Sequence, residues 1–412
     1  MLTRLWMLLP LSLLFFLSQF YRATPAVIAS ELMRDLSLTA EELGFLSSVF
    51  FYAFALIQIP MGAAMDIFGA KRLILLLSSM GICGAIIFAL AHSFPVAVIG
   101  RALIGVGMAC ALMGPYKLIS IWFPPHTFGT TSGLILSIGT LGSIVATAPL
   151  AFSVNWIGWR NAFLLISLIH LVITLWIYMA VNDSPDEYQK ENEFHLREKE
   201  WVKESMGGIL SVLRLPSFWL IALAAFVRYG TYISIAGLWA GPYLEHVYHI
   251  PLVERGKILM LFPLGFLLGG PLLGFLSDRV FSNRKFVALL AMGFYTVFFL
   301  PLTNYFPLPS LSMVAGIFFF IGFLTSCGNI MYANIKELLP SSISGTGMSA
   351  VNFFTMAGAG VYQHVMGVSI DKFSLHQVQL PPEAFSFAFG LCFVTAALGT
   401  FSYLFVKEVR PQ

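Results

Sequence analysis

Charged residues are scarce in this sequence, at 10% of 412 residues, against about 25% in an average soluble protein. Hydrophobic residues make up 58%. A soluble chain of this length with so few charges would not cover its surface with polar side chains. The lipid bilayer is therefore expected to be part of its solvent.

Several kinds of site are also missing. The net charge is only +3 and there is no basic tract, which argues against nucleic acid binding. No nucleophile stands beside a base, and no metal cluster or phosphate loop appears, so we expect neither an enzyme nor a cofactor. The four cysteines all lie in apolar runs, where we expect small core residues and no disulfide framework.

Long apolar runs are what the sequence does have. A membrane helix needs about 20 largely apolar residues, and such runs predict twelve spans: 6–30, 41–62, 73–92, 96–118, 128–151, 161–181, 215–243, 254–276, 286–304, 309–335, 345–369 and 384–406. The first run contains Arg22 and does not end in a small-residue cleavage site. It therefore predicts a retained membrane helix rather than a signal peptide.

The chain divides and repeats at its middle. The only long polar segment, rich in Glu and Lys, separates six predicted spans from six. We therefore expect an N-terminal bundle over 1–182, a cytoplasmic linker over 183–213 and a C-terminal bundle over 214–412. GAAMDIFGAKR begins at Gly62 and GFLSDRVFSNRK begins at Gly274, and each has an Asp four residues on and then a basic pair. Such duplication is a transporter architecture.

Lys and Arg in the predicted loops set the orientation. With the N-terminus inside, 14 of these residues face the cytoplasm and 5, among them Arg255, face outside. Cytoplasmic loops of membrane proteins carry an excess of positive residues. Both termini are therefore expected in the cytoplasm, in a cell inner membrane.

The first repeated loop resembles the signature loop of the major facilitator superfamily. Its pattern is Gly62-x-x-x-Asp66-x-x-Gly69-x-Lys71-Arg72. The resemblance implies a conformational latch in this loop and, with Asp278 and Arg279, in its repeat. The alternative is a loop that only sets topology and packing, since glycine permits close helix approach and Asp caps helix ends.

Other motifs agree with that family. Arg101-x-x-x-Gly105-x-Gly107 resembles its second motif, and Gly158-Trp159-Arg160 resembles the usual start of helix six. The resemblance implies an all-α membrane protein, with 12 transmembrane helices in two pseudo-symmetric six-helix bundles, working as a monomer in the lipid bilayer. Trp122-Phe123-Pro124 is similar to the anion–cation symporter and organophosphate antiporter branches, although the Glu-Arg-Gly that usually follows is absent.

Four cations lie inside the predicted spans: Arg22, Arg101, Lys117 and Arg228. No Asp or Glu lies in the middle of a span. Charges in a membrane are costly and usually functional. Arg101 is interpreted as structural or gating, whereas Lys117 either joins the solute pathway or extends to the interface.

Arg22 and Arg228 are 206 residues apart, close to the 212 that separate Asp66 from Asp278. They therefore occupy corresponding places in the two halves, on helices one and seven, which line the central cavity by family resemblance. A guanidinium suits carboxylate or phosphate. We expect both arginines to bind the anionic group of a small solute. The alternative is that each caps backbone carbonyls or pairs with a helix end.

Helical spacing adds neighbours to each arginine. Candidate solute-binding residues are Ser18 and Gln19 before Arg22, Tyr232 and Trp239 after Arg228, and Asn329 and Tyr332 on helix ten. For any one of them the alternative is an interhelical hydrogen bond.

The favoured function is a secondary active or facilitative transporter of a small carboxylate- or phosphate-bearing solute, which includes organic anions, amino acids or peptides, and phosphate esters. A multidrug or cation efflux transporter is the alternative, although it would want a carboxylate inside the membrane. The third hypothesis is a membrane enzyme or sensor, but the sequence shows neither a set of catalytic residues nor a sizeable soluble domain. The sequence leaves the direction of transport and the coupling ion open.

Overall fold

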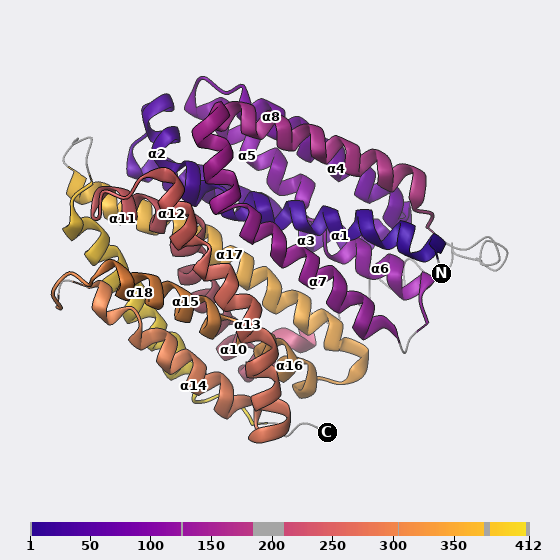
Figure 1. Ribbon diagram of the computed structural model, residues 1–412. Coiled ribbons are helices and arrows are strands. Elements are labelled where there is room, and N and C mark those ends of the chain that lie inside the picture. Colours follow the sequence, from indigo (N-terminus) through magenta and orange to yellow (C-terminus); the bar gives the residue numbers. More distant parts are fainter. Residues whose placement is uncertain (1, 125–126, 184–209, 304, 375–379, 409–412) are drawn as a thin grey trace. The chain divides into compact units, whose positions relative to one another are not determined.

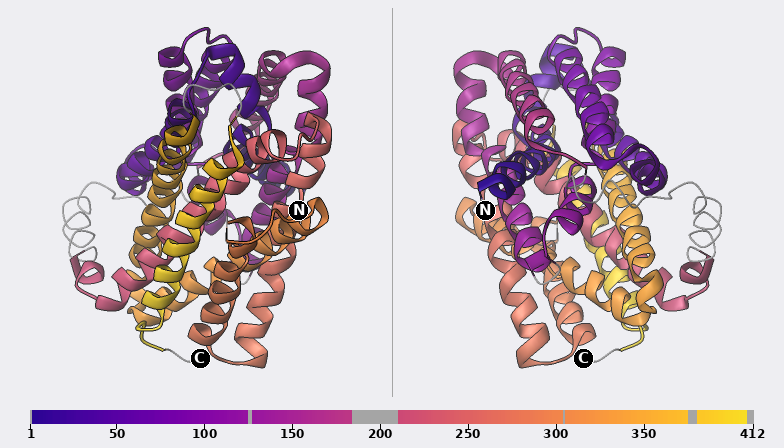
Figure 2. Two further views of the ribbon diagram at one scale, coloured as in Figure 1. Left: turned by 90° about the vertical axis from the view of Figure 1, so that its left-hand side faces the viewer. Right: turned by 90° about the vertical axis from the view of Figure 1, so that its right-hand side faces the viewer.

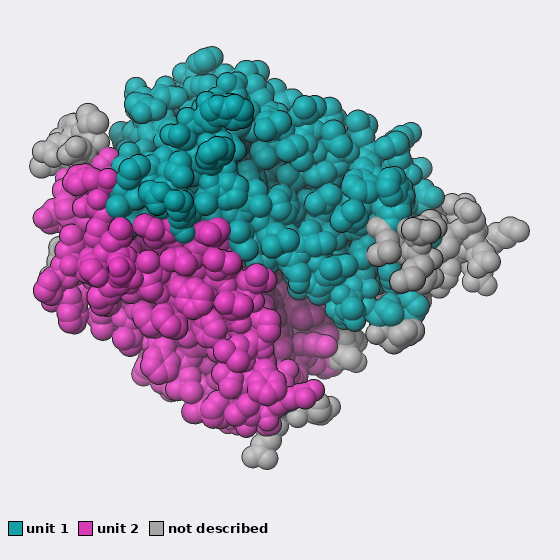
Figure 3. Space-filling view, viewed as in Figure 1, with its two compact units in different colours: residues 1–192, 237–245, 250–257 teal, residues 193–236, 246–249, 258–412 magenta. Residues whose placement is uncertain are grey.

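The computed structural model describes residues 2–124, 127–183, 210–303, 305–374 and 380–408, and over these ranges it is helical, without strands (Figure 1). By contact the chain falls into two units (Figure 3). Unit 1 holds residues 1–192, 237–245 and 250–257, and unit 2 holds residues 193–236, 246–249 and 258–412.

Over the described residues, unit 1 contains eight helices from the first half of the chain and two short helices from the second. The first eight are α1 (Leu2–Ala23), α2 (Pro25–Leu36), α3 (Ala40–Phe68), α4 (Ala70–Ala89), α5 (Phe94–Met108), α6 (Met113–Trp122), α7 (Phe128–Val145) and α8 (Ala148–Ala180). Most of α11 (Ala240–His246) and α12 (Leu252–Leu259) also belongs to unit 1. Helix α4 packs along α5 and α8, and α1 packs along α7.

Unit 2 contains the remaining helices. These are α10 (Pro216–Ser234), α13 (Leu261–Phe275), η4 (Leu276–Val280), α14 (Arg284–Val297), η5 (Leu300–Leu302), α15 (Leu311–Thr325), α16 (Gly328–Leu338), α17 (Ser341–Ser374) and α18 (Pro382–Tyr403). Helix α10 packs along α17 and α18, and these last two also lie side by side in the views of Figure 2. The π-helix η3 (Ile235–Trp239) continues α10 and contains the point where the chain passes from unit 2 to unit 1.

Each of the twelve predicted spans corresponds to a helix or to a broken run of helices. The first span is α1 with α2, which are bent by 51° at their junction. The fourth is α5 with α6, and the tenth is α15 with α16. By length and hydropathy, 10 helices of the described chain qualify as spans, or 11 with the bent pair. Helix α17 falls short of that criterion because polar residues such as Asn352 and Gln363 interrupt its apolar sequence.

The boundary between the fifth and sixth spans lies inside α8. Gly158 has φ of 78°, so two helices meet there across a kink. A positive φ suits glycine because it has no Cβ. The predicted start of helix six at Gly158 is therefore where the chain changes direction.

The second part of α8 has a continuous exposed apolar face. Leu165, Leu168, Val172, Leu175 and Met179 are each 48–71% exposed and follow one another at intervals of three or four residues. Such a helix face suits lipid rather than water.

The cysteines only partly fit the expectation from sequence. Cys110, Cys327 and Cys392 are buried, whereas Cys83 lies on the exposed side of α4. An apolar run predicts that a residue is in a membrane helix, but not whether it faces lipid or protein. The linker expected over 183–213 lies largely outside the described residues, and its boundaries stay a prediction.

Candidate functional site

The junction of α1 and α2 is shaped by Pro25, which stands at the start of α2. Proline has no backbone N–H, so the carbonyl of Tyr21, four residues earlier, loses its helical partner. Thr24 Oγ1 and Arg101 Nη1 each donate to this carbonyl at 3.1 Å. The kink therefore has side-chain donors in place of the missing amide.

Arg101 is 1% exposed and lies in α5. Its guanidinium carbon is 5.1 Å from the ring centre of Phe50 and 5.9 Å from that of Phe88. These cation–π contacts and the bond to Tyr21 hold the cation against the end of α1. The geometry fits the structural interpretation of Arg101.

Arg22 follows Tyr21 directly, yet its surroundings are different. It is 7% exposed, and its guanidinium carbon lies 4.5 Å from the centre of the Phe54 ring. Within the described parts of the chain, its guanidinium has neither an ion pair nor a hydrogen bond, and Nε is buried without a partner. A nearly buried cation of this kind leaves its hydrogen-bonding capacity for a ligand.

Two more polar groups without partners lie one turn before Arg22. Ser18 Oγ and Gln19 Oε1 are buried, and neither has a hydrogen bond to another described residue. At four and three positions before Arg22, they share its side of α1. One face of α1 thus carries a hydrogen-bond donor, Arg22, and two polar groups, Ser18 and Gln19, that have no partners among the described residues.

Arg228 lies on α10 in unit 2 and is 4% exposed. Its Nη1 donates to the Thr325 carbonyl, and to Thr325 Oγ1 at 3.0 Å. Gly328 lies against the same guanidinium, where a Cβ would clash with it. Arg228 thus caps the end of α15, where the span breaks before α16. Capping of backbone carbonyls was the alternative to solute binding in the sequence analysis.

The expected neighbours of Arg228 divide at the π-helix. Tyr232 is 8% exposed, and its ring stacks on that of Phe266 with centres 6.3 Å apart. Trp239 is fully buried, at the end of η3. The expectation that Trp239 shares a face with Arg228 assumed an uninterrupted α-helix. The π-helix changes the rotation per residue between the two positions, so a contribution of Trp239 to the same site stays a prediction.

The helix-ten candidates also differ from one another. Asn329 is exposed on α16, whereas the Tyr332 hydroxyl donates to Asn352 Oδ1 at 3.0 Å. That bond is an interhelical contact with α17. Lys117 is partly exposed on α6. Whether any of these three contacts a solute stays a prediction.

In unit 1 the proposed latch loop contacts the end of α8. Gly69 has φ of 83°, and a Cβ on it would lie 2.7 Å from Asp183 Oδ2. The Lys71 backbone N–H donates to Asp183 Oδ1 at 2.7 Å, so this carboxylate caps the start of α4. Arg72 is exposed. Gly62 and Asp66 are described only as part of the backbone of α3.

The repeated loop in unit 2 forms an ion network. Arg284 pairs with Asp278 and, at 2.8 Å, with Glu337 at the end of α16. Arg279 is exposed and takes no part in this network. The sequence reasoning missed Arg284, Glu337 and Asp183. Arg284 belongs to the basic pair of the repeated loop, which was a signal that could have identified it, whereas no sequence pattern linked Glu337 or Asp183 to the loops.

A comparison with protein families adds the decisive observation. The sequence profile of the Major Facilitator Superfamily matches residues 11–363 and, in a second overlapping match, 223–412. The chain belongs to the major facilitator superfamily. It is therefore a multi-pass membrane transporter rather than an enzyme, with the all-helical fold expected from its sequence.

Curated relatives in this superfamily include proteins named for organic anions. The chain is 26% identical over 286 residues to the probable sulfoacetate transporter of Cupriavidus necator. The match covers 68% of this chain and 66% of that protein, so the chain matches just under two thirds of that relative's length. It is 24% identical over 414 residues to the probable L-galactonate transporter of Escherichia coli K12, covering 93% of this chain and 85% of that protein. These names fit the anion–cation symporter resemblance.

Solved structures of the superfamily share the fold. The bacterial homologue of the human lysosomal transporter Spinster, crystallised in an inward-facing and unoccupied conformation, matches with a TM-score of 0.76. That match covers 98% of this chain and 97% of the other at 19% identity. At this identity the likeness shows the fold alone.

Proposed function

We propose that this chain carries a small carboxylate-bearing organic anion, of the sugar-acid kind, across the membrane by alternating access. The observation that carries the proposal is Arg22, a nearly buried cation without an ion pair or hydrogen bond in the described chain. An unpaired charge in a membrane span is costly unless a partner arrives. A guanidinium binds carboxylate in a bidentate manner.

The groups beside Arg22 suit the rest of such a solute. Ser18 Oγ and Gln19 Oε1 are buried and without partners in the described residues, on the same face of α1. A hydroxyl and an amide bind the hydroxyl groups of a sugar acid by hydrogen bonds. The names of the relatives, which mention sulfoacetate and L-galactonate, support an anion over a cation.

Arg228 is a second candidate ligand from unit 2, with a role different from that of Arg22. Because Thr325 occupies Nη1 of Arg228, the remaining N–H groups are those available to a solute.

We propose that this protein lies in the inner membrane with both termini in the cytoplasm, because the predicted cytoplasmic loops carry most of the Lys and Arg.

The test is solute-induced thermal stabilisation of the purified protein. The panel is L-galactonate, D-glucarate, D-glucuronate, sulfoacetate, neutral galactose and the lipophilic cation tetraphenylphosphonium. A ligand at 100 times its Kd stabilises the folded state by about 2.7 kcal/mol. The variants are Arg22→Ala and, as a matched control, Arg34→Ala, which removes an arginine that is 76% exposed.

We expect an anion of this panel to stabilise the wild type and Arg34→Ala, but not Arg22→Ala. Stabilisation by tetraphenylphosphonium alone would support the efflux alternative instead. An equal response of wild type and Arg22→Ala to an anion would show that Arg22 is structural.

A further inference from the structure

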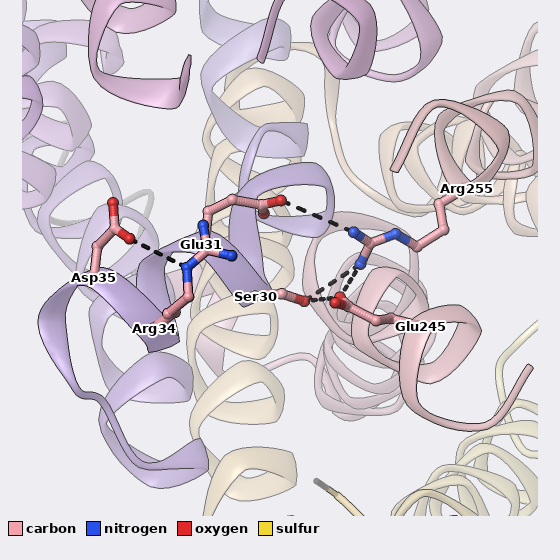
Figure 4. A network of polar contacts seen from close by, with 6 residues as sticks. All are labelled: Ser30, Glu31, Arg34, Asp35, Glu245 and Arg255. Carbon is pink, nitrogen blue, oxygen red and sulfur yellow. Dashed lines mark hydrogen bonds and ion pairs between the residues drawn. The ribbon is translucent and has the colours of Figure 1, made fainter. Parts of the chain in front are cut away.

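Four side chains on three helices form a polar cluster in unit 1 (Figure 4). We call it the Arg255 cluster: Ser30 and Glu31 on α2, Glu245 on α11 and Arg255 on α12. Arg255 is 5% exposed and pairs with Glu245 and, at 3.9 Å, with Glu31. Arg255 Nη1 also donates to Ser30 Oγ at 3.3 Å, and the Ser30 hydroxyl donates to Glu245. The sequence predicted only that Arg255 faces the outside of the membrane, and the structure shows that its side chain is buried.

The two carboxylates of the Arg255 cluster are not equally stabilised. Glu245 Oε2 accepts from both Arg255 and Ser30. Glu31 Oε1 is 3.9 Å from Arg255 Nη2, too far for a hydrogen bond. Glu31 Oε2 is buried and has no partner among the described residues. The cluster has one guanidinium for two carboxylates, so its excess negative charge falls on Glu31.

The other charged groups near α2 leave this excess in place. Arg34, one turn along α2, pairs with Asp35 and is 76% exposed, so water screens its charge. On the other elements packed against α2, Arg160 of α8 donates to the carbonyls of Ala89 and Ala91, and Glu42 of α3 belongs to its capping box. Glu41 of α3 is exposed, and Arg22 of α1 lies against the Phe54 ring. His246 at the end of α11 is a further titratable group, and the comparison with Glu31→Gln separates its titration from that of Glu31. Glu254 on α12 pairs with Lys257 and is 56% exposed.

The Arg255 cluster joins α11 and α12 to the rest of unit 1. Gly241 of α11 lies against the Ala26 carbonyl, where any Cβ would clash. A Cβ on Gly256 of α12 would lie 2.9 Å from the Cα of Ala148. These tight contacts follow η3, the π-helix in which the chain enters unit 1. Single π-turns are frequent at functional sites.

We propose that Glu31 is a proton-binding site that is occupied while α11 and α12 are held on α2, and is emptied when they are released. A proton on Glu31 leaves one carboxylate for one guanidinium, which removes the unbalanced buried charge. In the released state Glu31 is hydrated and ionised. Acidic conditions therefore favour the closed cluster, by linkage.

This site couples protonation to a change of packing in unit 1, an inference that rests on the proposed function, since alternating access requires packed helices to separate. The predicted membrane spans have no carboxylate at their middle, and the Arg255 cluster places one at the end of the first span instead. Each closing of the cluster takes up one proton, because one carboxylate is in excess.

The test is hydrogen–deuterium exchange of the full-length chain in lipid nanodiscs, without solute. Exchange of peptides covering 237–257 is followed in acidic and in mildly alkaline buffer. The rates are corrected for the intrinsic chemical exchange rate of unprotected amides at each pH. Glu31→Gln removes the proton site and keeps the shape of the side chain. Glu254→Gln is the matched control, since it neutralises an exposed carboxylate next to Arg255 on the same helix.

In the wild type we expect slower exchange of this segment in acid, by up to about tenfold for each pH unit, because one proton is bound. Glu31→Gln should exchange slowly in both buffers, and Glu254→Gln should behave like the wild type. Exchange that is independent of pH in the wild type overturns the proposal. So does an unchanged pH dependence in Glu31→Gln. Because no solute is present, either failure is distinct from a failure of the anion proposal.

Discussion

Arg22 and Arg228 stand at corresponding places in the two sequence repeats, yet their contacts differ. Arg22 in unit 1 lies against the Phe54 ring and has no hydrogen bond or ion pair with a described residue. Arg228 in unit 2 donates to the main chain and hydroxyl of Thr325. The same residue type, repeated, therefore has no hydrogen-bonding partner among the described residues in one half and caps a helix end in the other.

The reason lies in the local backbone of each half. In unit 1 the carbonyl freed by Pro25 receives Arg101, a different arginine, so Arg22 is not needed there. In unit 2 the broken helix end at Thr325 receives Arg228 itself. Duplicated sequences keep the position of a charge, but its role depends on which backbone groups lack partners nearby.

The largest expected effect separates the two arginines directly. Arg22→Ala should weaken anion binding by about 2–5 kcal/mol, as expected when one partner of a buried charge pair is removed. Its stability without solute should fall less than its affinity, because only packing and the contact with the Phe54 ring are lost, and no described hydrogen bond or ion pair. The two quantities are measured as Kd by calorimetry and as Tm without ligand. A large drop in ligand-free Tm for Arg22→Ala would contradict the comparison.

Removing the donor at the α1–α2 kink should have the next largest effect. Arg101→Gln is expected to lower stability by about 1.5–3 kcal/mol, since a hydrogen bond from a charged group to the Tyr21 carbonyl is lost. Pro25→Ala restores an amide that is able to donate to this carbonyl. The double variant, assayed by thermal unfolding, should therefore be less destabilised than the sum of the single variants. Simple additivity would show that the carbonyl is not the shared element.

In unit 2 the cap formed by Arg228 is testable through Gly328. Gly328→Ala places a Cβ against the Arg228 guanidinium and should destabilise the protein by about 1–3 kcal/mol, as overpacking does. Gly316→Ala on α15 is the matched control, because no atom lies within 4 Å of its added Cβ. Equal Tm values for the two variants would argue against a fixed position of Arg228.

The smallest effect is expected at the loop after α3. Asp183→Ala removes the cap on the Lys71 amide and should cost about 1 kcal/mol of stability. Arg72→Ala, which changes an exposed residue of the same loop, should leave Tm unchanged. A loss in Asp183→Ala no larger than in Arg72→Ala would mean that this cap does not stabilise the loop.

Much of the fold was predictable because hydrophobic runs and loops are local in sequence. All twelve expected spans correspond to helices, and the family follows from the loop that begins at Gly62. The same local reasoning did not anticipate η3, the π-helix that ends at Trp239, because it assumed a uniform α-helix. It also did not reveal the contacts of Arg255, because its partner Ser30 on α2 is 225 positions away in the chain.

The sequence by itself determined that the chain spans a membrane, that it consists of two related halves, and that Arg22 and Arg228 are cations without a carboxylate in mid-span. Composition and periodicity carry that information, because each span meets lipid along its own length. Only the tertiary structure decided which arginine has a partner and which carboxylate is in excess. Those outcomes depend on carbonyls and charges brought together from distant segments, such as Thr325 beside Arg228 and Glu31 beside Arg255.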